Sequence, residues 1–206
     1  MSGAFAAALA AFAVIIPVEL PDKTFIATLV LSTRYRPLPV WAGASAAFVI
    51  QSAVAAAAGG VIALLPELPV RIAAAVLFAV GAVLLARGAR SADDEEVEQE
   101  HEFESKAGAA RTGWKAFGTT FLVLFLAEWG DLSQLLTAGL VAAGRPAVPV
   151  FIGSWLGLVL VSGAGVLLGR VILRYVRLQI VRYVGAGVCV VLATVIAVEI
   201  VVSALS

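Results

Sequence analysis

Cysteine, histidine and methionine are almost missing from this sequence, which has one of each among its 206 residues. Cys189 lies in an apolar run, so neither a disulfide framework nor a thiolate metal cluster can form within one chain. We expect Cys189 to be a small residue that packs between helices. The scarcity of nitrogen and sulfur ligands argues against a site for copper, nickel or zinc.

Charge is also scarce. The 14 basic and 14 acidic groups make up only 14% of the chain and cancel to a formal net charge of zero, so no nucleic-acid partner is expected. In contrast, 62% of the residues are hydrophobic and the mean hydropathy is +1.03, which indicates an integral membrane protein in contact with the lipid bilayer. The richness in Ala, Val, Gly and Arg favours a bacterial protein, for which we predict a multi-pass location in the inner membrane.

Six apolar segments are each long enough to cross a hydrocarbon core, which takes roughly twenty residues. They cover residues 4–32, 39–65, 69–88, 115–142, 147–170 and 180–204. The acidic stretch DDEEVEQEHEFE lies between the third and fourth segments and does not match a calcium-binding EF-hand loop, so we interpret it as a solvated linker. The sequence thus predicts an all-α integral membrane protein, with three-helix units at 1–90 and 113–206 and a linker at 91–112.

The basic residues predict the orientation of these helices. The odd-numbered loops and their borders hold Arg34, Arg36, Arg87, Arg90, Lys106, Arg111, Lys115, Arg170, Arg174, Arg177 and Arg182, whereas the even-numbered loops hold Arg71 and Arg145. By the positive-inside rule, the odd loops and the acidic linker are cytoplasmic and both termini lie outside. No basic residue precedes Lys23, so the first apolar run is predicted to be a retained helix and not a secretory signal.

The two halves of the sequence superpose when the chain is shifted by 109 residues, the distance from Glu19 to Glu128. The same shift places Asp22 on Asp131, Thr24 on Ser133, Thr28 on Thr137, Ser45 on Ser154 and the pair Arg36 and Pro37 on Arg145 and Pro146. A unit of three helices crosses the membrane an odd number of times, so its second copy runs in the opposite sense. We therefore predict two inverted three-helix repeats.

Two pairs of acids lie midway along predicted spans: Glu19 with Asp22, and Glu128 with Asp131. A spacing of three residues places each pair on one helix face. Ionised acids at that depth cost at least a few kcal/mol each, so they should face the bundle interior, a cavity or a cation. The inverted repeat predicts that the two pairs meet near the middle of the bilayer.

The helices are predicted to be interrupted at these acids. Pro17 and Pro21 flank the first pair and remove backbone donors, while Gly130 gives the second pair a flexible backbone. The carbonyls freed by such breaks lie beside the carboxylates and favour an oxygen-lined cation site, as in transporters with broken helices.

Other polar residues along the apolar segments can either support this site or pack helices. Lys23 can pair with one carboxylate but cannot neutralise four. The small hydroxyls of Thr28, Thr137, Ser45, Ser52, Ser154 and Ser162 commonly pack helices. Burial of Gln51 and Gln134 is costlier, and for these two both roles stay open. Lys23, Gln51, Gln134, Thr28 and Thr137 are therefore predicted as supporting residues.

The donor chemistry predicts the ion. The candidate site offers only oxygen atoms, and His101 lies in the linker, so Ca²⁺, Mn²⁺ or Mg²⁺ is expected. Crowded carboxylates in a medium of low dielectric constant take up protons when no cation is present. Competition of cation and protons for the same acids is what a secondary transporter that exchanges the two requires, with the metal as substrate and no cofactor.

Two other classes of membrane protein share part of this pattern. An exporter of small organic solutes such as amino acids could share the helix count, but it would not need four crowded acids. An intramembrane aspartyl protease is suggested by EWGD, which superficially matches a Gly-x-Gly-Asp motif. Glu128 stands in place of the first glycine, and the symmetry of the halves argues against a dedicated peptide site.

The two stretches ELPDKT and EWGDLS resemble the hallmark of the GDT1 family, also called uncharacterised protein family 0016 or the transmembrane protein 165 family. That hallmark is Glu-x-Gly-Asp-(Lys/Arg)-(Ser/Thr), once in each half. Here Pro21 replaces the first glycine and Leu132 replaces the second basic residue. The resemblance covers essentially the whole chain.

This resemblance implies exchange of Ca²⁺ or Mn²⁺ for protons, with export of the metal from the cytoplasm and, for a bacterial member, a lean toward Mn²⁺. It implies metal ligation by Glu19, Asp22, Glu128 and Asp131, with supporting oxygens from Thr24 and Ser133. Small-residue patches such as AAAAGG, Ala55 to Gly60, are compatible with packing inside one chain or in a homodimer.

Overall fold

The computed structural model describes residues 2–20, 22–89, 92–107, 113–175 and 178–205. Every regular element in these ranges is a helix, which confirms the all-α fold class. The helices are α1 (Ser2–Glu19), α2 (Lys23–Arg34), α3 (Pro37–Ile62), α4 (Glu67–Gly88), α5 (Ala92–Ala107), α6 (Trp114–Ala127), α7 (Leu132–Ala142), α8 (Ala147–Tyr175) and α9 (Leu178–Leu205). Pro21, Arg90, Arg111 and Arg177, and the side chains of Arg170 and Arg174, lie outside the described part of the chain.

Four helices are long and apolar enough to cross a membrane by themselves: α3, α4, α8 and α9. Two further apolar stretches are split into bent pairs. Helices α1 and α2 meet at 65°, and α6 and α7 meet at 67°. The protein is therefore a multi-pass membrane protein, and the predicted six spans are reached when each bent pair forms one span.

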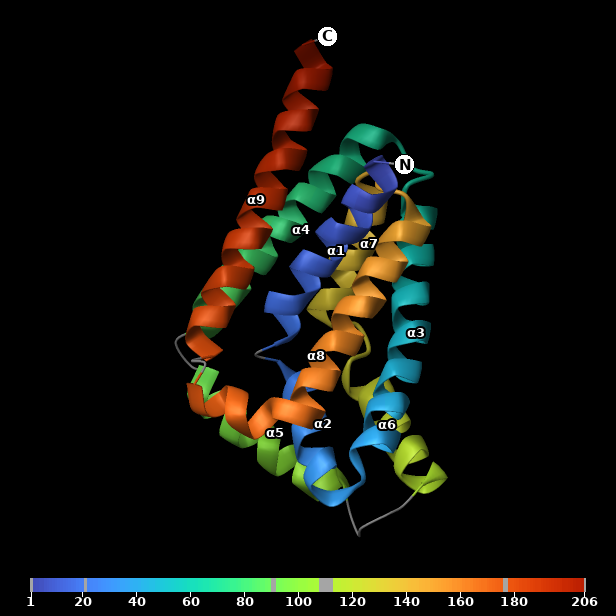
Figure 1. Cartoon of the computed structure of the whole chain (residues 1–206). Coiled ribbons are helices and arrows are strands. Elements are labelled where there is room, and N and C mark those ends of the chain that lie inside the picture. Colours follow the sequence, from blue (N-terminus) through green and yellow to red (C-terminus); the bar gives the residue numbers. More distant parts are fainter. Residues whose placement is uncertain (1, 21, 90–91, 108–112, 176–177, 206) are drawn as a thin grey trace.

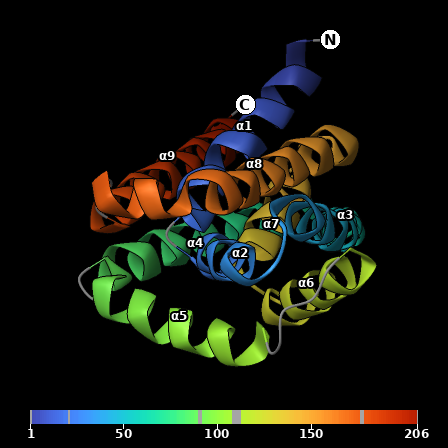
Figure 2. The same cartoon turned by 60° about the horizontal axis from the view of Figure 1, so that its bottom comes forward.

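Figure 1 shows the long helices side by side, with both termini at one end of the bundle and α5 across the other end. The same arrangement is visible in Figure 2, where α5 lies along the edge of the end that comes forward. The most extensive helix contacts pair α4 with α9, α1 with α8, and α3 with both α6 and α8. Each half of the chain is thus packed largely against the other half, with α1 and α3 both bound to α8.

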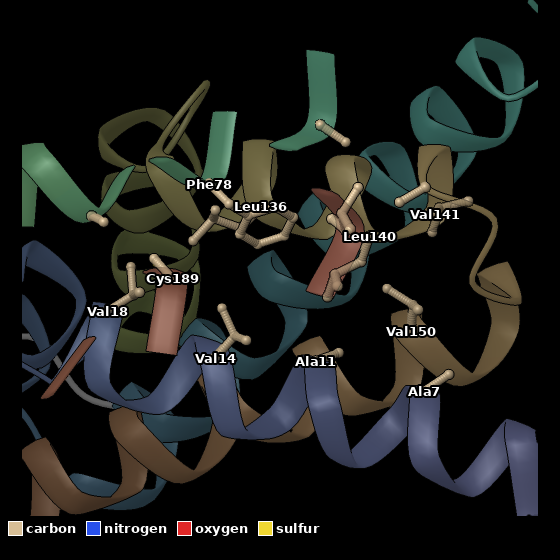
Figure 3. Close-up of a cluster of buried hydrophobic side chains, with 14 of the residues drawn as sticks. Ala7, Ala11, Val14, Val18, Phe78, Leu136, Leu140, Val141, Val150 and Cys189 are labelled. Atoms are coloured by element: carbon tan, nitrogen blue, oxygen red, sulfur yellow. The ribbon is translucent and has the colours of Figure 1, made fainter. Parts of the chain in front are cut away.

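The core around α1 follows from the spacing of its apolar residues. Ala7, Ala11, Val14 and Val18 recur every three or four positions and line one helix face, as Figure 3 shows. This face packs against side chains from four other helices, namely Phe78, Leu136, Leu140, Val150 and Cys189. Cys189 is fully buried in this cluster, as expected of a small packing residue.

Small residues allow close helix contacts within the chain. A Cβ atom on Gly59 would lie 2.4 Å from the carbonyl oxygen of Ala138, so α3 and α7 touch through their backbones at this point. Ala55 and Ala56 in the same patch are buried. Gly59 in this patch therefore packs two helices of the same chain against each other. A role of the patch in pairing two chains stays a prediction.

The acidic linker forms a helix, α5, that is docked on the bundle. Phe103 is 1% exposed and packs in the apolar cluster that contains Phe25 and Ile26 of α2. Arg34, at the end of α2, forms an ion pair with Glu104 at 3.8 Å. Acidic side chains such as Glu98 and Glu102 are exposed, as expected of a solvated linker. The buried face of the helix was not predicted, and Phe103 is the residue in the acidic stretch that could have indicated it.

Candidate cation site

The first break lies between α1 and α2. Helix α1 ends at Glu19, and α2 begins at Lys23 after Asp22, whose backbone is extended. The side chain of Asp22 accepts a hydrogen bond from the backbone N–H of Lys23 at 2.8 Å, so Asp22 caps the new helix. The predicted interruption at the first pair of acids is confirmed, and it places Glu19 at the C-terminal end of one half-helix and Asp22 at the N-terminal end of the next.

The second break lies at the equivalent place in the second half. Helix α6 ends at Ala127, and α7 begins at Leu132. Between them Gly130 has a φ of 80°, a left-handed conformation that glycine adopts without steric cost. Asp131 precedes α7 but makes no capping hydrogen bond with its side chain. Its carboxylate is therefore free of the capping hydrogen bond that Asp22 makes.

The two breaks bring acids from both halves together. Glu19, Glu128 and Asp131 each offer a carboxylate oxygen, and these three oxygens all lie within 4.8 Å of one another. Glu19 is 0% exposed and Glu128 is 3% exposed. Asp22 is near enough to interact electrostatically with Glu128, although it does not belong to the group of three. The predicted meeting of the two acid pairs is thus seen for three carboxylates, with the fourth at their edge.

The polar atoms of this cluster lack partners. Both carboxylate oxygens of Glu19 and of Glu128, Oδ2 of Asp131 and the hydroxyl of Thr24 are buried without a hydrogen bond to any described residue. Buried carboxylates in this condition are strongly destabilised unless they bind a cation or a proton. The donor set is entirely oxygen, which suits a hard divalent cation.

The two hydroxyls predicted as supporting oxygens lie at the cluster. Thr24 is 0% exposed and Ser133 is 4% exposed, and both are beside the carboxylate of Glu19. They occupy equivalent positions in the first turns of α2 and α7. Each half thus contributes a glutamate and a hydroxyl to the same small volume.

The threonines one turn further along these helices are engaged elsewhere. Thr28 donates its hydroxyl proton to the carbonyl of Thr24 at 2.8 Å. Thr137 lies 2.8 Å from the carbonyl of Ser133 and 2.9 Å from the hydroxyl of Ser154 on α8. Both threonines therefore hold the helix turn that carries a candidate ligand, and neither hydroxyl points to the carboxylates as a free donor.

The two glutamines stabilise the second break. The Gln134 amide donates to the carbonyl of Glu128 at 2.8 Å, and its oxygen accepts from the backbone N–H of Gly130 at 3.2 Å. Gln51 of α3 is 2% exposed and donates to the carbonyl of Phe125 at 3.1 Å. These bonds satisfy backbone groups that the interrupted helix leaves without partners. Both glutamines thus act on the backbone around the site.

Two positive charges lie near the site. Lys23 is exposed at the first residue of α2, and its charge acts on the adjacent Asp22. Arg182, counted in the sequence among the loop arginines, is instead 6% exposed and interacts electrostatically with Asp22. Arg182 stands close to the start of α9 within an otherwise apolar run, and this position could have predicted its burial.

Comparison with known proteins identifies the family of this chain. Residues 7–93 and 116–203 match the family described as divalent cation/proton antiporter GDT1. The chain belongs to the GDT1 family. It is thus a member of a transporter family and not of an enzyme family, and the two matched ranges contain the two broken helices.

Curated GDT1-like proteins are similar over most of the chain. GDT1-like protein 3 of Arabidopsis thaliana is 27% identical over 196 residues, covering 88% of this chain and 67% of that protein. GDT1-like protein 4 of Oryza sativa subsp. indica is 30% identical over 169 residues, covering 75% and 60%. A GDT1-like protein of Synechocystis sp. is 28% identical over 175 residues, covering 81% and 84%. No solved structure matches the chain significantly.

Proposed function

We propose that this protein exchanges Mn²⁺ or Ca²⁺ for protons across a bacterial inner membrane and exports the metal from the cytoplasm. The observation that carries the proposal is the convergence of Glu19, Glu128 and Asp131, each of which offers one carboxylate oxygen within 4.8 Å of the other two. Both carboxylate oxygens of Glu19 and Glu128 and Oδ2 of Asp131 are buried without a hydrogen bond to any described residue. Such a group favours either a divalent cation or protons, and it cannot hold both at full occupancy. Mutual exclusion of the two substrates is the basis of coupled exchange.

The ligands that we propose are Glu19, Asp22, Glu128 and Asp131, with oxygens of Thr24 and Ser133 completing the shell. Asp22 is included because it lies near enough to Glu128 to interact with it electrostatically, which makes it the fourth carboxylate of the cluster. Four carboxylates and two hydroxyls give the six or more oxygen ligands that Ca²⁺ and Mn²⁺ accept.

The architecture that we propose is a pair of inverted repeats, residues 1–90 and 113–206, joined by the linker at 91–112. In support, the bends of 65° and 67° fall at equivalent positions in the two halves. The excess of arginine in the odd loops favours a cytoplasmic α5 with both termini outside. Rocking of one repeat against the other would expose the site first to one side and then to the other.

The test is cation-driven proton movement in proteoliposomes that contain a pH-sensitive dye. Wild-type protein should release protons in response to Mn²⁺ or Ca²⁺ and less to Mg²⁺, which sheds its water reluctantly. Glu19→Gln and Glu128→Gln should abolish this flux, because each removes a charge from the centre of the cluster. Glu67→Gln serves as the control, since that carboxylate is 74% exposed and outside the site.

Absence of flux with every divalent ion, from protein shown to be folded and inserted, would contradict the proposal. Proton movement driven by amino acids, unaffected by Mn²⁺ or Ca²⁺, would replace it with an exporter of organic solutes. Ranking the ions by their apparent affinity in the same assay would identify the physiological substrate class.

A further inference from the structure

An apolar groove runs along the outside of the bundle and contains none of the clustered acids. Figure 1 shows α8 with α1 on one side and α3 on the other, and both helices pack on α8. The groove has a volume of about 780 Å³, and its lining residues come from these three helices and are all apolar. Helices α1 and α3 belong to the first half of the chain and α8 to the second, so the groove lies where the two halves meet.

Contacts on both sides of α8 shape this groove. On one side a Cβ atom on Gly157 would lie 3.1 Å from Cγ2 of Ile15, so α1 lies close against α8. On the other side the indole N–H of Trp41 donates a hydrogen bond to the carbonyl of Val159 at 3.0 Å. The polar atom of Trp41 is therefore already satisfied by α8, and the described lining residues offer water no free hydrogen-bonding side chain.

This lining favours a hydrocarbon occupant. A water molecule in such a site needs roughly two to four polar partners, which apolar side chains do not provide. An unfilled groove would lose dispersion contacts along its walls. Leu38 is 70% exposed and Leu160 is 52% exposed, so the groove opens outward, toward lipid in a membrane. An acyl chain is the apolar molecule that a bilayer supplies there.

The length of the groove matches one leaflet of a bilayer. Leu156 and Leu167 both line it and lie eleven residues apart on α8, about 16 Å along the helix axis. One leaflet is roughly 15 Å thick, half of a hydrocarbon core of about 30 Å. The groove begins beside Pro37 and Leu38 in the first turn of α3 and reaches Phe12 of α1. It therefore has the depth of one leaflet, with one end at the membrane surface.

A positive charge stands at the surface end of the groove. Arg36 directly precedes Pro37, is exposed and makes no side-chain cap for α3. Among the ion pairs between described residues it takes part in none, whereas its repeat equivalent, Arg145, is paired with Glu199. A phospholipid carries an anionic phosphate at this depth. Twofold pairing of two copies through the groove would instead bring two Arg36 residues to the same depth, so charge favours a phospholipid over a second copy.

We propose that this groove binds one acyl chain of an anionic phospholipid, with the phosphate beside Arg36. Burial of apolar surface holds the chain, and Arg36 selects the headgroup. One arginine near the membrane surface favours an anionic headgroup over a zwitterionic one by about fivefold. In the proposed orientation the lipid belongs to the cytoplasmic leaflet and lies against both halves of the chain. This lipid site does not depend on the proposed cation/proton exchange.

Native mass spectrometry of the full chain, extracted in a mild detergent and titrated with phosphatidylglycerol or phosphatidylcholine, tests the site. Wild type should bind the first phosphatidylglycerol about fivefold more tightly than phosphatidylcholine. Arg36→Gln should remove this preference, and Leu160→Trp, which fills the groove, should weaken binding of both lipids. The matched controls are Arg87→Gln, at an exposed arginine of α4, and Leu84→Trp, at a leucine that is 55% exposed outside the groove.

Tryptophan fluorescence then locates the lipid. Variants keep one of the four tryptophans, either Trp41 or Trp129, and carry phenylalanine at the other three positions. They are placed in phosphatidylcholine liposomes with an equal small fraction of brominated phosphatidylglycerol or brominated phosphatidylcholine, whose bromines quench nearby indoles. Trp41 lines the groove and should be quenched more strongly by the anionic lipid. Trp129 is 57% exposed outside the groove and should be quenched equally by both.

Equal affinity of wild type for the two lipids, or a preference that survives Arg36→Gln, would overturn the proposal. A doubled mass without bound phospholipid, reduced to one chain by Leu160→Trp, would assign the groove to a second copy and overturn it as well. Both assays proceed without transport. Protein that binds phosphatidylglycerol as expected but moves no protons in response to divalent ions would therefore contradict the exchange alone.

Discussion

Both broken helices interrupt a span beside a pair of acids, but different contacts stabilise the two breaks. At the first break Asp22 caps α2 with its own carboxylate, and Phe25, at the repeat position of Gln134, is buried in an apolar cluster. At the second break the side chain of Asp131 makes no cap, and the Gln134 amide donates to the carbonyl of Glu128 and accepts from the N–H of Gly130. One short motif can thus interrupt a helix through either packing and a carboxylate cap or amide hydrogen bonds.

The contacts that stabilise each break affect how much charge its aspartate brings to the cluster. Where an amide stabilises the backbone, the aspartate keeps its charge for the cluster, and where the aspartate caps the helix, part of that charge is shared with backbone N–H groups. Asp131 accordingly joins Glu19 and Glu128 within 4.8 Å, while Asp22 stays at their edge. The two halves are therefore expected to respond unequally to matched substitutions.

The largest difference is expected between Asp131→Asn and Asp22→Asn. Loss of the Asp131 charge should lower divalent-driven proton flux by about 100-fold, and the Asp22 variant by about tenfold, because asparagine still caps α2 and the charge removed is less central. Rates in proteoliposomes, normalised to inserted protein, measure this. Equal losses would mean that the two aspartates contribute equally to cation binding, and the asymmetry would then be a property of one state only.

A second expected difference concerns α5, which packs against α2 in the first half of the chain. Phe103→Ala should lower the free energy of unfolding by about 3 kcal/mol, since it empties a buried aromatic site between α5 and α2. Thermal melts report the loss, and hydrogen exchange should rise in α5 and α2 before α7. Val97→Ala is the control because Val97 is 55% exposed on the same helix. Uniform exchange in both halves would contradict a local role of α5.

The amide support of the second break is tested by Gln134→Met. This change keeps the size of the side chain but leaves the Glu128 carbonyl and the Gly130 N–H without their bonds, at a cost of about 1–3 kcal/mol. Melting temperature and flux should both fall. Gln179→Met, at an exposed position of α9, should change neither. A fully stable Gln134→Met would show that packing holds this break without the amide hydrogen bonds.

Gly130→Ala should destabilise by about 1–2 kcal/mol, because its φ of 80° is left-handed and an added Cβ is strained there even though the space is open. Gly118→Ala in α6 is the matched control. No heavy atom lies within 4 Å of its added Cβ, and alanine favours a helix interior, so stability should rise slightly. If Gly130→Ala and Gly118→Ala change the stability alike, the left-handed backbone at Gly130 is not required for the helix break.

The smallest effect concerns the exposed face of α5. The hydrogen bond from Lys106 holds the pKa of Glu102 below its usual value. Because the folded-state pKa is the lower one, the pair stabilises α5 at neutral pH and this contribution is lost as the pH falls through the pKa of Glu102. Both groups are exposed, so Lys106→Met should change stability by less than about 1 kcal/mol at pH 7 and still less at pH 3. A larger loss of stability on acidification would show that electrostatic interactions contribute substantially to holding α5 in place.

Much of this site could be predicted from residues alone. The cost of ionised acids in a span, together with Pro17 and Gly130, predicted broken helices at the two motifs, and both breaks are present. The roles of Gln51 and Gln134 could not be separated beforehand, because only the path of the backbone shows which carbonyls lack partners. Phe103 and Arg182 were missed, since a single aromatic residue in an acidic run and a single arginine near a helix start resemble ordinary interfacial residues.

The sequence by itself determined the membrane class and the helical spans, and it located the two places where the spans are interrupted beside acids, because hydropathy and charge act over local stretches of chain. Tertiary structure decided which acids converge, which aspartate caps a helix and where Arg182 lies. Those outcomes depend on packing between segments far apart in the chain, such as α9 against α1 and α4, and the distances between such segments are not contained in any local pattern.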